Sequence, residues 1–126
     1  MPCSYKIYKD KRLVVTTALG KITFAEAIAY TEQLSRDPDF DPTYSQLVDA
    51  TGVTKSEITG PELSSLARRT RFSPQSRRAI VVTSTFLFGL GRMYEAYSQV
   101  SGKAESIVVF KELDKAKEWL GITDEL

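Results

Sequence analysis

Strand-like and helix-like segments alternate along almost the whole of this chain with little linker between them. Apolar or β-branched runs occupy residues 5–8, 12–18, 45–50, 79–83 and 107–110, and an amphipathic helical pattern follows each of the last four. Asp10-Lys11 separates the first two runs, a spacing typical of a hairpin. Strands that alternate with helices predict a mainly parallel sheet with right-handed crossovers. We therefore predict an α/β fold with an N-terminal β-hairpin, four βα units and a five-stranded sheet.

The expected helix boundaries have specific signals. Thr23-Phe24-Ala25-Glu26 and Thr59-Gly60-Pro61-Glu62 both have the capping-box pattern, which predicts that Thr23 and Thr59 are helix N-caps. The first helix should end before Asp37-Pro38, because the residue before a proline disfavours the helical region. Gly121 stands at the usual position after the last helix.

Length and composition indicate one domain, residues 1–126, of ordinary globular character. No apolar run approaches the roughly 20 residues of a membrane span, and the start of the chain lacks the apolar region of a signal peptide. The single cysteine suits a reducing compartment, so we expect a cytoplasmic location. A net charge of +1 gives no general attraction to nucleic acid, and no specific nucleic-acid partner is expected.

The chain contains no histidine. Serine and cysteine nucleophiles that rely on an imidazole base are therefore excluded. The common zinc and non-haem iron ligand sets are excluded as well, because one cysteine cannot replace the missing imidazoles. We predict that the protein is not an enzyme and has no metal or other cofactor.

The segment after the fourth predicted strand is the candidate ligand site. Three hydroxyls precede the apolar, glycine-containing stretch 86–91, and in parallel α/β proteins ligands bind beyond the C-terminal ends of strands. Glycines allow the backbone to pivot, while exposed phenylalanines are unfavourable. We predict a mobile lid over residues 85–91 that covers an apolar pocket, with the loops 18–22 and 50–54 as neighbours. The candidate ligand and lid residues are Thr83, Ser84, Thr85, Phe86, Leu87, Phe88, Gly89, Gly91, Met93 and Tyr94. The alternative is that these side chains simply close the core or a dimer interface.

Five arginines within eleven residues form a candidate basic patch: Arg68, Arg69, Arg71, Arg77 and Arg78. The simplest interpretation is a solvated face, in which the first three offset the negative end of a helix dipole. The other two precede the fourth strand, at the end opposite the expected ligand crevice. The alternative is a surface for phosphate, anionic lipid or RNA.

Several segments taken together resemble the SpoIIAA-like proteins, small relatives of the STAS domains that include anti-sigma-factor antagonists. These segments are Gly20-Lys21-Ile22-Thr23-Phe24, residues 37–42 (DPDFDP), Leu47-Val48-Asp49, residues 88–94 (FGLGRMY), residues 109–113 (VFKEL) and Trp119-Leu120. The resemblance implies a βα superhelix and a non-enzymatic role. It also implies a fold related to lipid-carrying CRAL-TRIO domains, and therefore apolar ligands or membrane contact.

The same resemblance indicates a candidate phosphorylation site. Anti-sigma-factor antagonists are switched at a serine in an Asp-Ser-Ser-Gly motif, and the corresponding stretch here is Glu57-Ile58-Thr59-Gly60. Thr59 matches the modified position, whereas Glu57 and Ile58 depart from the motif. The alternative is that Thr59 is only a helix cap.

Two functional hypotheses follow. The first is binding of a small apolar or amphipathic molecule, or of a membrane surface, under the segment 85–91. The second is a protein-interaction module of the anti-sigma-factor-antagonist type, regulated by phosphorylation at Thr59. We also expect a homodimer, because monomers rarely leave large apolar surfaces uncovered.

Overall fold

The computed structural model describes residues 3–101 and 107–122 and has the predicted α/β architecture. In chain order the strands are β1 (Cys3–Tyr8), β2 (Leu13–Ile22), β3 (Ser45–Ser56), β4 (Arg78–Val81) and β5 (Ile107–Phe110). The helices are α1 (Phe24–Arg36), α2 (Gly60–Arg69), α3 (Thr85–Ser101) and α4 (Leu113–Leu120). A short 3-10 turn, η1 (Lys9–Lys11), connects β1 to β2.

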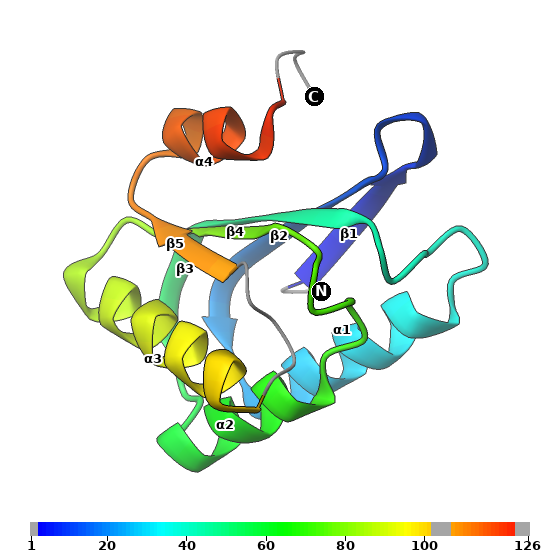
Figure 1. Ribbon diagram of the computed structural model, residues 1–126. Helices are drawn as coiled ribbons and strands as arrows, with labels where there is room; N and C mark the ends of the chain where they lie inside the picture. Colours follow the sequence, from blue (N-terminus) through cyan, green and yellow to red (C-terminus); the bar gives the residue numbers. More distant parts are fainter. Residues whose placement is uncertain (1–2, 102–106, 123–126) are drawn as a thin grey trace.

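The sheet order is β1-β2-β3-β4-β5, the same as the order in the chain. The β1–β2 pair is antiparallel, and the other three pairs are parallel. Because successive parallel strands are added in one direction, right-handed crossovers place α1, α2 and α3 on the same face of the sheet. Figure 1 shows these three helices on one side of the sheet and α4 on the other.

The two faces of the sheet are packed differently. Under α4, Leu47, Ala79 and Val81 form a buried cluster with Ala116. Helix α4 covers this face of β4 and β5, and α3 packs against β5 on the other face. The face toward α1–α3 contains two separate clusters, one around Val14 and Phe72 and one around Ala50 and Leu87.

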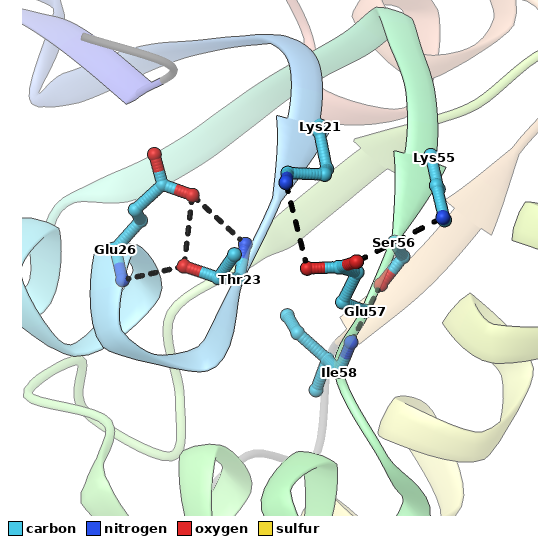
Figure 2. A network of polar contacts seen from close by, with 7 residues as sticks. All are labelled: Lys21, Thr23, Glu26, Lys55, Ser56, Glu57 and Ile58. Atoms are coloured by element: carbon cyan, nitrogen blue, oxygen red, sulfur yellow. Dashed lines mark hydrogen bonds and ion pairs between the residues drawn. The ribbon is translucent and has the colours of Figure 1, made fainter.

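Both predicted capping boxes are present. Thr23 Oγ1 accepts a hydrogen bond from Glu26 N (3.2 Å), and Thr23 N donates to Glu26 Oε1 (3.1 Å), as Figure 2 shows. The box at α2 has the same form, with 3.3 Å from Glu62 N to Thr59 Oγ1 and 2.9 Å from Thr59 N to Glu62 Oε1. The helix α1 ends at Arg36, before Asp37-Pro38, and Gly121 has the left-handed conformation (φ 76°) that suits glycine.

The strands β2 and β3 are longer than predicted. Residues 18–22 and 50–54, which we expected to be loops, continue the parallel pairing as far as Ile22 and Ser56. Gly20 has φ +67°, a left-handed conformation that favours glycine, and it lies at a register shift in this part of the pairing. At the end of this ribbon, Glu57 lies between Lys21 (3.7 Å) and Lys55 (3.8 Å), as Figure 2 shows.

The prediction that residues 85–91 form a loop is wrong, because helix α3 begins at Thr85. Ser84 explains the difference: its Oγ accepts a hydrogen bond from Leu87 N at 3.0 Å, and its backbone oxygen accepts one from Phe88 N at 2.9 Å. Ser84, one of the three hydroxyl residues before Phe86, is therefore the N-cap of α3. Gly91 is also not a hinge, because a Cβ there would lie 2.6 Å from Val109 Cγ2, so glycine permits close packing of α3 on β5.

Candidate ligand-binding cavity

A cavity of about 250 Å³ lies between the sheet and the layer formed by α1, α2 and α3. Its walls come from every strand except β5 and from all three of these helices. Two lining residues, Val48 and Ile80, lie in central strands and yet are only half-buried. Central strand residues that face a helix layer are normally buried completely. The helices therefore leave space above the middle of the sheet.

Most of the cavity wall is apolar. Toward the C-terminal ends of the strands the lining residues are Ala18, Ile22, Ala50, Val53, Ile58, Val82, Leu87 and Leu90. These side chains belong to the cluster around Ala50 and Leu87 or pack against it. This end of the cavity offers a ligand dispersion contacts and apolar burial.

The opposite end of the cavity is polar. Gln46 Nε2 donates hydrogen bonds to Thr16 Oγ1 and to the Tyr30 hydroxyl, both at 3.0 Å, and these two oxygens are themselves in contact. Burial raises the pKa of Tyr30 to about 12, so its hydroxyl remains protonated at neutral pH. Gln46 and Thr16 are almost completely buried, and Gln46 Oε1 accepts a hydrogen bond from Arg78 Nε at 3.0 Å.

The structure corrects the prediction for Arg78. We expected a solvated side chain, but Arg78 is 7% exposed and lines the cavity. It is the first residue of β4, and alternation along the strand directs it toward the helices together with Ile80. Gln46 and Arg78 are paired in register on neighbouring strands, which places both polar side chains on the cavity side of the sheet.

The predicted lid residues are divided between cavity and solvent. Leu87, Gly91 and Tyr94 line the cavity, whereas Phe86 is 68% exposed and Met93 is 39% exposed. The remaining predicted residues do not form its wall: Thr83, Ser84, Thr85 and Gly89 are exposed, and Phe88 is half-buried with the Lys111 ammonium 4.9 Å from its ring. Among these candidate residues, Tyr94 therefore lines this cavity, whereas Thr83 and Met93 do not.

The other four arginines of the predicted patch are exposed. Arg68 and Arg69 donate hydrogen bonds to Ser64 (2.8 Å) and Ser65 (3.0 Å) in the preceding turn of α2. The Arg77 guanidinium lies 4.2 Å from the centre of the Trp119 ring, so it packs on α4. Arg71 is exposed and also lines the cavity, so the cavity reaches the surface beside it.

Among the described residues, no group of three or more histidine, cysteine, aspartate or glutamate side chains is placed to hold a metal ion. In the same part of the chain, no helix is both long enough and apolar enough to span a membrane.

Comparison with known proteins identifies the architecture. No family model and no curated protein matches the chain. A solved structure superimposes with a TM-score of 0.60 over 94% of this chain and 91% of the other, at 17% sequence identity. It is an uncharacterized protein of the DUF3478 family from Shewanella loihica PV-4, described as having a SpoIIAA-like fold. This chain has a SpoIIAA-like fold. The predicted resemblance is confirmed at the level of the fold.

Proposed function

We propose that this SpoIIAA-like chain is a binding protein that holds a small amphipathic molecule in the cavity under its sheet. The observation that supports this most directly is the division of the cavity wall into an apolar end and a hydrogen-bonded polar end. A mainly apolar pocket with a few convergent polar groups is the usual form of a small-molecule site.

The size of the cavity limits the ligand. An apolar protein cavity of about 150 Å³ accommodates benzene, and pockets for drug-sized molecules start near 300 Å³. The 250 Å³ here lies between these values. The ligand is therefore expected to be small, with a tail of medium length or a single ring.

Cys3 provides a direct test of occupancy. It is the single cysteine of the chain, it is half-buried, and it lines the cavity. Burial raises the pKa of its thiol, so its reaction with a disulfide reagent is best followed at mildly alkaline pH. We expect 1-octanol or octanoate to slow this reaction in a saturable way. Trp119 lies on the opposite face with Phe110, so its fluorescence should stay constant and serves as the internal control.

Two valine-to-phenylalanine variants, one inside the cavity and one on the opposite face of the sheet, provide a matched pair. Val48→Phe places extra side-chain volume into the cavity and should abolish the protection of Cys3 by either probe. Val15→Phe makes the same change on the opposite face, where Val15 packs beside the cluster under α4, and should leave protection unchanged. If neither probe slows the reaction of the unmodified protein, the proposed function is wrong.

A second candidate function rests on Thr59, which is exposed at the N-terminus of α2. A helix N-terminus stabilises a phosphate, as the proposed phosphorylation-regulated interaction requires. However, the hydroxyl is already used in the capping box with Glu62, whose carboxylate would repel a phosphate. Intact-mass measurement of protein isolated from its source cells tests this candidate. A phosphate mass that is lost in Thr59→Ala supports it, and an unmodified mass contradicts it.

A further inference from the structure

We propose that the cavity selects a monoanion, an apolar carboxylate whose carboxylate group binds Arg78. This inference rests on the proposed function, since it identifies the chemical class of the molecule that the cavity holds. It starts from the charge of the Arg78 guanidinium, which the protein buries without neutralising it.

The partners of Arg78 are all neutral. Its Nε donates to Gln46 Oε1 (3.0 Å), its Nη1 to Thr70 Oγ1 (3.1 Å) and its Nη2 to the Tyr94 hydroxyl (3.3 Å). Within the described residues, no carboxylate lies within ion-pair distance of this side chain. A buried charge without a counter-charge is unfavourable, and proteins normally pair such a group. An anionic ligand would supply the missing partner.

The guanidinium has donors available for that ligand. An arginine has five N–H groups, and the three hydrogen bonds above use three of them. The remaining two belong to the Nη atoms, which are the donors that arginine commonly presents to a carboxylate. Two N–H donors of the charged guanidinium in one plane match the two oxygens of that group.

The position of Arg78 is fixed before a ligand arrives. The Phe72 ring lies 4.7 Å and the Tyr94 ring 5.7 Å from the guanidinium carbon, so aromatic faces support the cation. On the other side, Gln46 is oriented by its bonds to Thr16 and Tyr30, which direct its carbonyl oxygen at Arg78. A group held in this way loses little freedom when it binds a ligand.

A single negative charge suits the buried part of the site. Arg78 is the buried guanidinium there, whereas Arg71, which also lines the cavity, is exposed to solvent, where its charge is screened. The apolar end of the cavity then receives the tail, along the wall that runs from Val48 toward Val53 and Leu87. The polar and apolar ends of the cavity thus match the head and tail of one amphipathic molecule.

The test compares two probes of similar shape and different charge. Octanoate is ionised at pH 7, and 1-octanol is neutral. With the Cys3 reaction as the readout, we expect octanoate to bind the unmodified protein about tenfold or more tightly than 1-octanol, as a charge-assisted hydrogen bond implies. Arg78→Gln should abolish this preference while 1-octanol still protects Cys3.

Arg77→Gln is the matched control, because it removes a neighbouring exposed guanidinium that packs on Trp119. It should leave the preference for octanoate intact. Equal binding of the two probes by the unmodified protein would overturn the carboxylate proposal but leave the proposed function standing. This comparison of octanoate with 1-octanol uses the unmodified protein, so it tests the carboxylate proposal even if Arg78→Gln does not fold. Protection by neither probe would overturn both proposals.

Discussion

Two glycines in the first turns of α3 allow a sharp test of whether residues 85–91 are helical. Gly89 is exposed, and a Cβ added there would meet nothing within 4 Å in the described part of the chain. Alanine is favoured over glycine in a helix interior by about 0.5–1 kcal/mol. Gly89→Ala should therefore raise the free energy of unfolding by that amount, or the melting temperature by about 2–4 °C for a chain of this size.

Gly91→Ala gains the same helix propensity, but its new Cβ clashes with a neighbouring side chain, whereas the Cβ of Gly89→Ala does not. The new Cβ would lie 2.6 Å from Val109 Cγ2, and Val109 is a buried, β-branched residue that has little freedom to move. Forcing extra volume into a packed core costs about 1–3 kcal/mol. Because the helix term is common to both variants, the difference between them measures the packing cost directly.

Chemical denaturation measures the free energy of unfolding of each variant. The set consists of Gly89→Ala, Gly91→Ala, and Gly91→Ala combined with Val109→Ala, with Val109→Ala alone as the reference for the combined variant. Removing the Val109 methyl groups should restore most of the stability that Gly91→Ala loses, as a coupling energy in a double-mutant cycle. If Gly89→Ala is destabilising, residue 89 is not in a helix and the mobile-lid hypothesis regains support. If Gly91→Ala is as stable as Gly89→Ala, the close approach of α3 to β5 is wrong.

The remaining predictions concern a cap, acid stability and association. Thr23→Ala should lower the free energy of unfolding by about 1 kcal/mol, measured by denaturation, because it removes the capping box of α1. The pKa values of Asp37 and Asp41 are lowered mainly by backbone N–H donors, so their stabilisation is present above the ordinary pKa of 3.8 and is lost as pH falls through the lowered values. Replacing both by asparagine should flatten the acid limb of a pH–stability curve. We also predict a homodimer that uses the exposed Phe86; sedimentation should show a dimer for the unmodified protein and a monomer for Phe86→Ser.

The fold was largely predictable because its determinants are local. The two capping boxes and the hairpin spacing each depend on residues within a few positions of one another, and all are present as predicted. The start of α3 was missed because Ser84 is a cap without a glutamate three residues later, so the capping-box pattern is absent. Glycines at 89 and 91 then suggested a loop, although only Gly91 is needed for a close contact, and that contact is with a strand 18 positions away.

The site was less predictable, because it depends on which face of the sheet each strand residue occupies. A run of arginines such as 68–78 indicates a solvated surface, and four of the five are indeed exposed. Arg78 differs because it is the first residue of a strand and pairs in register with Gln46, which directs it inward. A one-residue shift of this strand would exchange the positions of Arg77 and Arg78, so that Arg77 would face the cavity and Arg78 would face Trp119. Which of the two arginines is buried therefore depends on the register of β4 against β3, which a sequence pattern with period two cannot fix at a strand end.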